Sequence, residues 1–458
     1  GLAAAAAGAA VELHAAVASL SQLFSQQALS MAEAQWGLVL LMLVAFIYLW
    51  HVSGGSFDIL TWHKTALGYT PQILIFLALL AACGQGDDRT ELVVQRFFGS
   101  CQADYGAVND PAKADGECGI MTTLINRFEA DNPDIRVVEN VVFWPGYDQL
   151  TAQLAANGPP DLVTMHSSAI SDYEARDLLE PLNPVLAQAG VSPESFTPAA
   201  RAGVMVGDQV MGLPIDVWAP LWHINMNLFR KAGLVRDGRP ILPSSPEEFD
   251  AHARQFRERT GKPYLVQVTD KDFAGPMRIF YMYVMQQGGA PFRDARHSNF
   301  NSPEGQRALG FMRDLYQQGH SVRNQDYAGA VSTFLKGEGG VLIDGTWMVG
   351  QFTAASQRED SALADGYAVR PFPAIFKERN VSLVDGHNWV MPRDERRTQA
   401  QREAAARFLR FFADNNFQWA RTGHFPAYTS IIESAEWRAL PHRSDIAVLT
   451  QIGEPLPR

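Results

Sequence analysis

Apolar residues follow two different patterns in this chain, and the change between them falls near residue 83. Up to that point they come in unbroken runs, among them Trp36 to Trp50 and Pro71 to Cys83. Beyond it, short apolar runs of strand length alternate with segments in which apolar residues recur every three or four positions, as on one face of a helix. Strand, helix and strand in this order predict an α/β fold with a parallel sheet and helices on its faces.

The amino-terminal region, residues 1–83, is predicted to contact a membrane. The run from Trp36 to Trp50 is apolar all round and, with its neighbours, reaches about the shortest length that crosses a bilayer. Nothing amphipathic surrounds it, which favours membrane contact over a buried core helix. Residues 40–80 also resemble part of an antiporter-like membrane subunit of NADH:quinone oxidoreductase. Their apolar segments lack the central ionisable residue that a proton path needs, so no respiratory activity is expected.

A second apolar run ends in a motif for lipid attachment. Pro71 to Cys83 has the length of a signal peptide and ends in small residues. Leu80-Ala81-Ala82-Cys83 resembles a bacterial lipobox, and a chance cysteine after an apolar run is the alternative. The resemblance implies that Cys83 becomes the lipidated first residue of a membrane-anchored protein, with residues 84–90 as a polar linker.

The other two cysteines, Cys101 and Cys118, bracket a polar excursion that follows the first predicted strand, Glu91 to Gly99. In a periplasmic or cell-surface protein such a pair is expected to form a disulfide. Closing a loop of this size lowers the entropy of the unfolded chain and contributes about 3 kcal/mol to stability.

An extended apolar stretch in the middle of the chain predicts a passage between two domains. It runs from Gly212 to Asn225, is stiffened by Pro214 and Pro220, and carries Trp218 and Trp222. An ordinary buried strand explains this spacing equally well. With Gly212-Leu213-Pro214 ahead of it, the stretch resembles the hinge-crossing segment of the extracellular solute-binding proteins of ABC transporters, in the family that carries sugars and related polyols.

Further segments carry the same resemblance, namely Pro160 to Val163 with Leu178 to Leu182, Val341 to Trp347, and Leu383 to Met391. The resemblance implies two lobes, each a sheet flanked by helices, joined by hinge crossings. It places residues 91–215 and 345–396 in lobe I, and residues 216–344 and 397–458 in lobe II.

A sugar has apolar C–H faces and a rim of hydroxyl groups, so its site needs aromatic planes together with hydrogen-bond donors and acceptors. We expect two or three tryptophans to contact the ligand and others, including Trp222, to pack inside. For the polar candidates, capping of turns or strand ends is the competing role. The resemblance and this chemistry together give as candidate ligand-binding residues Trp144, His166, Ser167, Ser168, Asp216, Trp218, Asp272, Phe273, Trp347, His387 and Asn388.

The function that the resemblance implies is capture of a carbohydrate by hinge closure and its delivery to an ABC permease. A ligand-sensing subunit would use the same fold without a permease. A glycan-acting enzyme would need a pair of carboxyl groups that the sequence does not exclude. We expect a monomeric, non-enzymatic binding protein in the periplasm or at the cell surface.

Composition argues against several other classes of protein. The chain has 458 residues, more than one ordinary core, and its net charge of −11 argues against a nucleic-acid partner. The histidines and cysteines show no metal-ligand spacing, so no metal is expected. The glycine cluster at Gly337 to Leu342 lacks the third glycine of a phosphate-binding fingerprint and runs into a strand, so no cofactor is expected either.

Overall fold

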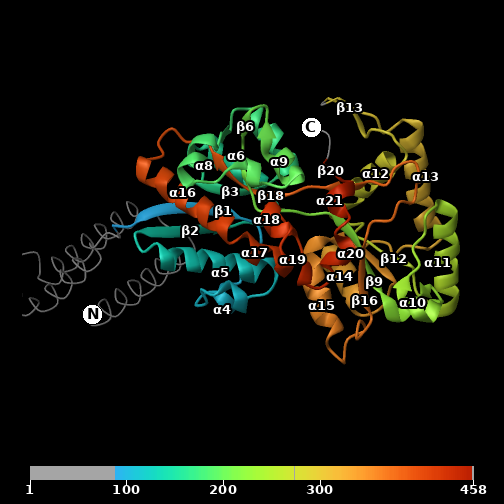
Figure 1. The fold of residues 1–458 in the computed structure, drawn as a ribbon. Coiled ribbons are helices and arrows are strands. Elements are labelled where there is room, and N and C mark those ends of the chain that lie inside the picture. The colour runs from blue at the N-terminus through green and yellow to red at the C-terminus, as the bar shows by residue number, and fades with distance from the viewer. Residues whose placement is uncertain (1–87, 273, 295, 456–458) are drawn as a thin grey trace, which may run out of the picture. The chain divides into compact units, whose positions relative to one another are not determined.

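The computed structural model describes residues 88–272, 274–294 and 296–455, which fold into two lobes (Figure 1). The predicted membrane-contacting run, the lipobox with Cys83 and most of the linker lie outside the described residues, as does Phe273. No helix within the described part of the chain has both the length and the apolar composition needed to cross a bilayer.

Lobe I is built on a mixed sheet with the strand order β2-β1-β3-β18-β4, and β7 also pairs with β18. β1 runs parallel to β2 and β3, as the strand–helix–strand order predicted, whereas β18 returns antiparallel to its neighbours. The strands are β1 (Thr90–Arg96), β2 (Ile135–Val141), β3 (Leu162–His166), β4 (Leu179–Glu180), β7 (Leu213–Pro214) and β18 (His387–Pro392).

Helices cover this sheet, and Figure 1 shows α5 below its strands and α6 and α8 above them. α16 packs on α8, β1 and α5, and its start is fixed by a capping box of Thr398 and Gln401. The helices of this lobe are α4 (Gln102–Tyr105), α5 (Gly116–Asp131), α6 (Tyr147–Ala155), α7 (Ser167–Glu174), α8 (Asn183–Ala189), α9 (Pro198–Val204), α16 (Gln399–Asp414) and α17 (Asn416–Ala420), with the hairpin of β5 (Met205–Val206) and β6 (Gln209–Val210).

Lobe II has a second sheet, with the strand order β12-β15-β9-β16. β9 lies antiparallel to both β15 and β16, and β12 is parallel to β15. The strands are β9 (Pro220–Asn225), β12 (Leu265–Val266), β15 (Val341–Gly345) and β16 (Tyr367–Pro371). The second half of the predicted hinge stretch is therefore a central strand of lobe II, and Trp222 packs inside it as expected.

Two helices of lobe II begin at a serine whose side chain caps the first turn. The hydroxyl of Ser245 accepts a hydrogen bond from the amide of Glu248, and that of Ser302 accepts one from the amide of Gly305. The helices are α10 (Met226–Ala232), α11 (Pro246–Thr260), α12 (Ala274–Gln286), α13 (Pro303–Gln317), α14 (Tyr327–Leu335) and α15 (Val349–Ser356), with the hairpins β10 (Val235–Arg236) with β11 (Arg239–Pro240) and β13 (Phe292–Asp294) with β14 (His297–Ser298).

Short strands connect the lobes. β8 (Asp216–Val217) leads from β7 into β9, and β17 (Ser382–Val384) leads from β16 back to β18. β8 pairs with β19 (Phe425–Pro426), and β17 pairs with β20 (Gly453–Pro455), so the carboxyl-terminal segment supports both crossings. The helices between β19 and β20 are α18 (Thr429–Ile432), α19 (Ala435–Ala439), α20 (Arg443–Ile446) and α21 (Leu449–Ile452).

The lobe boundaries differ from the predicted ones in two places. β16 falls within residues 345–396, which were assigned to lobe I, but it pairs with β9 in lobe II. α16 falls within residues 397–458, which were assigned to lobe II, but its Phe408 contacts Phe128 and Trp389 in the core of lobe I. Periodicity indicates that an element exists, whereas the packing partner of its apolar face decides which sheet it joins.

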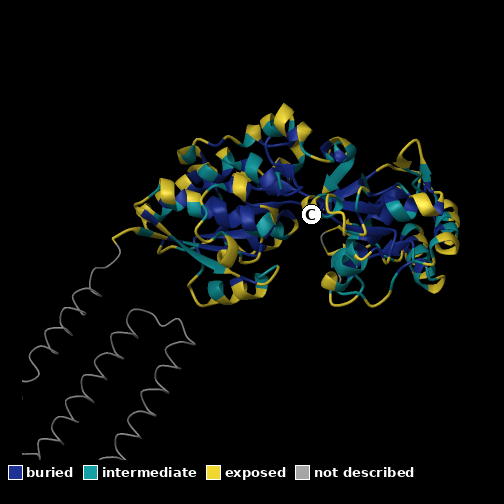
Figure 2. Ribbon diagram, turned by 90° about the horizontal axis from the view of Figure 1, so that it is seen from below, coloured by how far each residue is buried: buried dark blue, intermediate teal, exposed yellow. Residues whose placement is uncertain are grey.

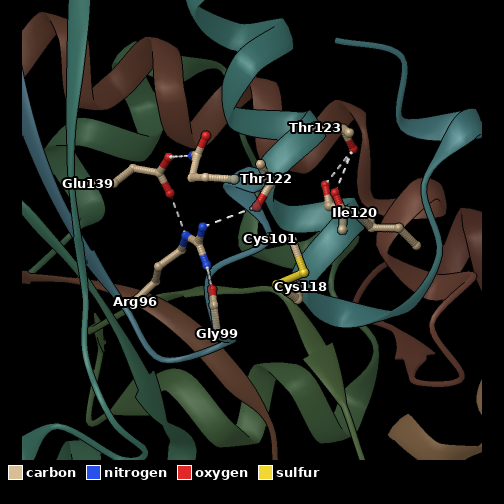
Figure 3. The surroundings of a disulfide bond; sticks show 10 residues. Arg96, Gly99, Cys101, Cys118, Ile120, Thr122, Thr123 and Glu139 are labelled. Carbon is tan, nitrogen blue, oxygen red and sulfur yellow. Dashed lines mark hydrogen bonds and ion pairs between the residues drawn. A yellow bond between two sulfur atoms is a disulfide. The ribbon is translucent and has the colours of Figure 1, made fainter. Parts of the chain in front are cut away.

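Each sheet is the centre of a hydrophobic core. Figure 2 shows the buried residues concentrated in the strands of both lobes, with exposed residues on the surrounding helices and loops. The predicted disulfide between Cys101 and Cys118 is present and ties the loop after β1 to the first turn of α5. Beside it, the buried guanidinium of Arg96 donates to the carboxylate of Glu139, with Nε 2.6 Å from Oε2, and to the carbonyl of Gly99 (Figure 3).

Candidate functional site

Predicted residues come together at one edge of the sheet in lobe I. β3 ends at His166, Ser167 and Ser168 follow at once in α7, and β18 begins at His387. Because β18 runs antiparallel to β3, the register pairs His387 with His166, and their ring centroids lie 4.9 Å apart. The carboxyl ends of β1 and β3 thus share an edge with the start of β18, the edge at which open α/β sheets bind ligands.

His166 is a buried and neutral member of this edge. Its ring stacks on Phe97 at a centroid distance of 5.2 Å, and its Nδ1 lies 2.7 Å from the hydroxyl oxygen of Tyr147. Burial lowers the pKa of His166 well below its usual value, and the positive charges of His387 and Arg278 act in the same direction. The neutral imidazole therefore offers a hydrogen-bonding group rather than a charge.

Trp144 supplies an exposed aromatic plane beside His166. The side chain is 39% exposed, and its ring meets the imidazole of His166 edge-on at 5.7 Å. An exposed indole that is already oriented by a neighbour can bind an apolar face of a solute at low entropic cost.

Asp216 and His387 form an internal pair, in contrast to the predicted role of Asp216 as a ligand contact. Asp216 is 1% exposed, and its Oδ2 lies 2.8 Å from Nδ1 of His387 and 2.7 Å from Nε1 of Trp419. Burial alone would raise the pKa of Asp216, but the imidazoles of His387 and His424 and these hydrogen bonds outweigh it and bring the pKa to about 2. A carboxylate satisfied in this way joins the hinge to lobe I and has no exposed surface for a solute.

The remaining polar candidates of this edge differ in exposure. Asn388 is buried, and its Nδ2 donates to the carbonyl of Met165 and to the hydroxyl of Ser167, at 3.1 and 3.0 Å. Ser168 is exposed and donates from its amide and its hydroxyl to the carboxylate of Asp385, at 3.1 and 2.6 Å. Ser168 can therefore reach a solute, whereas Ser167 and Asn388 bond within the lobe.

Two predicted tryptophans meet at the junction of the lobes. Trp218 lies on the first crossing and Trp347 in the turn after β15, with ring centroids 5.5 Å apart and planes inclined at 74°. Trp218 is only 1% exposed, and the guanidinium carbon of Arg278 lies 4.5 Å from its ring centroid. Trp218 therefore packs against Trp347 and Arg278 and has almost no exposed surface of its own. The partly exposed indole of Trp347, whose Nε1 donates to the hydroxyl of Tyr327 at 2.9 Å, is the plane that a solute can reach.

Arg278 is the side chain of this site that sequence analysis missed. It lies in α12, whose residues are otherwise mostly apolar, and a single arginine in such a run is the signal that could have found it. Within the described ranges its guanidinium has no hydrogen bond and no ion pair. Burial lowers the pKa of Arg278, although the carboxylates of Asp385 and Asp272 act in the opposite direction. A partly buried cation without a paired carboxylate is suited to an anionic or strongly polar ligand.

Asp272 makes the kind of turn-capping hydrogen bond that was the alternative to ligand binding. It is partly exposed, and its Oδ1 accepts a hydrogen bond from the amide of Ala274 at 2.8 Å, which caps the start of α12. This hydrogen bond positions the first residue of the helix that carries Arg278.

Asp344 is a further acidic group near the junction. It lies at the end of β15, 9% exposed, and accepts a hydrogen bond from the amide of Gly345 at 2.7 Å. Burial raises the pKa of Asp344 to about 7, because this hydrogen bond does not offset the loss of hydration.

The pH dependence of stability should report this shift. The folded protein holds the proton of Asp344 more tightly than the unfolded chain does, so Asp344 makes stability fall as pH rises from about 4 to about 7. We expect the free energy of unfolding of Asp344→Asn to lack this decrease. Relative to the wild type, the variant should therefore become more stable as pH rises from about 4 to about 7. Urea unfolding of both proteins at several pH values measures this difference in the free energy of unfolding. A difference that stays the same at every pH would contradict the raised pKa of Asp344.

A cavity of 1190 Å³ lies apart from these residues, beside α9 and the carboxyl-terminal helices. Its lining includes Val217 and Val384 from the crossings together with Phe425 and Trp437, but none of the predicted ligand residues. We place the candidate site at Trp347 instead, because aromatic planes and polar groups converge there.

Two lobes joined by hinge strands, with aromatic and charged side chains at their junction, define a binding protein for a small solute. A family model described as bacterial extracellular solute-binding protein matches residues 112–418. The chain belongs to this family, which places it at the periplasm or the cell surface.

Similar proteins support the same fold. The sn-glycerol-3-phosphate-binding periplasmic protein UgpB of Shigella dysenteriae is 22% identical over 338 residues, covering 68% of this chain and 72% of the relative. The putative ABC transporter periplasmic-binding protein YcjN of Escherichia coli is 21% identical and covers 83% of this chain and 82% of its own.

Solved structures at similar distance include a maltose-bound MalE3 of T. maritima, with a TM-score of 0.66, 18% identity, and coverage of 81% of this chain and 90% of that one. Another is UgpB of Mycobacterium tuberculosis in complex with glycerophosphocholine, with a TM-score of 0.62, 18% identity, and coverage of 73% and 83%.

Proposed function

We propose that the protein captures a carbohydrate or related polyol between its lobes and delivers it to an ABC permease, while a lipid on Cys83 holds it at the membrane. The observation that carries the proposal is the partly exposed indole of Trp347, set at the lobe junction against Trp218, whose ring also contacts the guanidinium of Arg278. An indole suits the C–H face of a sugar, and a guanidinium donates to its hydroxyl groups.

Hinge closure couples binding to transport. The crossings β8 and β17 are short strands of two and three residues, so small backbone rotations there can move one lobe relative to the other. A solute that contacts both lobes binds the closed form more tightly and increases its population. The closed form would be the state that a permease recognises.

A phosphorylated polyol is a second candidate. It is favoured by the guanidinium of Arg278, which has no carboxylate partner among the described residues. Arginine recognises phosphate through charge-assisted, often bidentate hydrogen bonds. UgpB proteins named for sn-glycerol 3-phosphate or solved with glycerophosphocholine are among the similar proteins. The two candidates share Trp347 and differ in what Arg278 contacts.

Titration of tryptophan fluorescence tests both candidates. Wild-type protein is titrated with maltose, mannitol, sn-glycerol 3-phosphate and glycerophosphocholine, and the samples are then analysed for products. We expect saturable binding without turnover, whereas product formation would favour the glycan-acting enzyme. If no member of a broader sugar and polyol panel binds, the proposal is wrong.

Replacing Arg278 separates a neutral ligand from a phosphorylated one. If phosphate binds to Arg278, Arg278→Met should weaken affinity for the phosphorylated polyol about tenfold or more, because a hydrogen bond to a charged group contributes about 1.5–3 kcal/mol. Arg176→Met is the matched control, since Arg176 also lies over an aromatic ring, that of Tyr173, but on the surface of lobe I. Equal loss for neutral and charged ligands would exclude a phosphate contact.

Two observations test the proposed permease partner and the proposed lipid anchor on Cys83. Two permease genes next to this one would favour transport over a sensing subunit. Amino-terminal analysis of the membrane-extracted protein should find a blocked, lipidated Cys83, and a retained Gly1 would contradict the anchor.

A further inference from the structure

We propose that Glu117, His387 and His424 form a binding site for a divalent transition-metal ion of the zinc class. One ligand atom of each residue lies within 4.8 Å of those of the other two. Two imidazoles and one carboxylate are a set used by zinc sites that keep a fourth position open for water or another oxygen ligand. The inference is independent of which solute the protein carries.

The three residues come from distant parts of the chain, which is why the sequence indicated no metal site. Glu117 lies in the first turn of α5, next to the disulfide-bonded Cys118. His387 is the first residue of β18, and His424 immediately precedes β19. Pairing of β8 with β19 and of β18 with β3 brings the two histidines together at the hinge.

Hydrogen bonds hold both imidazoles in the orientation that metal binding needs. Oδ2 of Asp216 lies 2.8 Å from Nδ1 of His387, and Oγ1 of Thr346 lies 2.9 Å from Nδ1 of His424. Metal-binding histidines generally have such a partner, which fixes the tautomer and increases the basicity of the other nitrogen. In both rings Nε2 is then the nitrogen available to an ion.

The two Nε2 atoms differ in what they contact. That of His424 lies 2.8 Å from Oε1 of Glu117, so one nitrogen and one oxygen ligand are already adjacent. That of His387 makes no hydrogen bond within the described part of the chain, where only Nδ1 of this ring has a partner. An internal hydrogen-bond network explains the contact of His424 with Glu117 but leaves this nitrogen unused, whereas a bound ion would use all three groups.

Charge favours a divalent cation at this place. An ion that binds the two imidazoles displaces any proton from them, and the carboxylates of Asp216 and Glu117 then leave two negative charges around the cluster, with Asp216 buried. A divalent ion balances them. Since Thr346 precedes Trp347, and the ring of His424 lies 6.2 Å from that of Trp347, occupancy of the site would also stiffen the turn that carries the candidate solute contact.

Zinc binding by the full chain tests the proposal. The purified protein is stripped with a chelator, incubated with Zn²⁺ alone and passed through gel filtration, and the retained metal is measured by mass spectrometry. Competition with a chromogenic chelator gives the affinity. We expect one zinc per chain, with affinity reduced more than about tenfold in Glu117→Gln and His424→Gln and about tenfold in Thr346→Val, which removes only an orienting hydrogen bond.

The control is His297→Gln, because His297 is an exposed histidine paired with Asp294 in a hairpin of lobe II. It should retain zinc as the wild type does. Circular dichroism checks that each variant folds. If His424→Gln does not fold, the zinc affinity of Glu117→Gln is the deciding measurement, because Glu117 is partly exposed and its replacement should not prevent folding. Absence of zinc from the wild type, or unchanged affinity in a folded Glu117→Gln, would overturn the proposal.

Discussion

Replacing Asp216 by asparagine should lower the free energy of unfolding by about 3–5 kcal/mol, the usual cost of removing one partner from a buried ion pair. Asp216 accepts hydrogen bonds from the amide and the imidazole of His387 and from the indole of Trp419. Asparagine is nearly isosteric, but it carries no charge and cannot accept on both side-chain atoms. The buried imidazole of His387 would then lose its counter-charge.

The pH dependence of this difference follows from the two pKa shifts. The pKa of Asp216 is depressed to about 2, so its contribution is present above about pH 4 and is lost as pH falls from about 4 to about 2. The pKa of His387 is raised: burial lowers it, but the charge and hydrogen bond of Asp216 outweigh burial. The contribution of His387 is therefore complete below about pH 6.5 and is lost as pH rises through the folded-state value.

Urea denaturation of wild type and Asp216→Asn between pH 2 and 9 measures the loss in free energy of unfolding and the pH range over which it occurs. The matched control is Asp172→Asn, which removes the exposed pair of Asp172 with Arg176 and should cost less than about 1 kcal/mol. A cost below about 1 kcal/mol for Asp216→Asn near pH 6 would show that the buried pair does not stabilise the hinge.

The second large effect is expected from Trp347→Ala. If the indole of Trp347 is the plane on which the solute packs, its removal should weaken solute binding by at least about 30-fold, the loss typical of a central aromatic contact. Stability should change little by comparison, because the side chain is partly exposed. Isothermal titration calorimetry with the ligand identified by the fluorescence screen gives the affinity, and thermal unfolding gives the stability.

Trp389→Phe is the matched control for this variant. Trp389 is fully buried in lobe I, where it contacts Phe408 and Phe412, so its replacement should lower stability and leave solute affinity unchanged. Equal affinities of Trp347→Ala and wild type would mean that the solute binds elsewhere, and the cavity lined by Val217 and Trp437 would then be the next place to examine.

Much of the architecture could be predicted from local signals. Ser245 and Ser302 mark helix starts because a hydroxyl acceptor before a proline satisfies a free amide in the first turn, whatever lies around it. The pairing of Cys101 with Cys118 followed from their number and position. The tryptophans were recognised as a group, but exposure divides them, since Trp144 and Trp347 are accessible while Trp218 and Trp222 are buried.

The sequence by itself determined the class of fold, the succession of strands and helices, the hinge stretch and the disulfide, because each depends on neighbours within one element or on a few residues in series. Only the tertiary structure decided that α16 belongs to lobe I, that Asp216 pairs with His387, that Arg278 lies over Trp218, and that Glu117 meets His424. These outcomes depend on side chains far apart in the chain whose distances are set by strand register and helix packing, which no local pattern encodes.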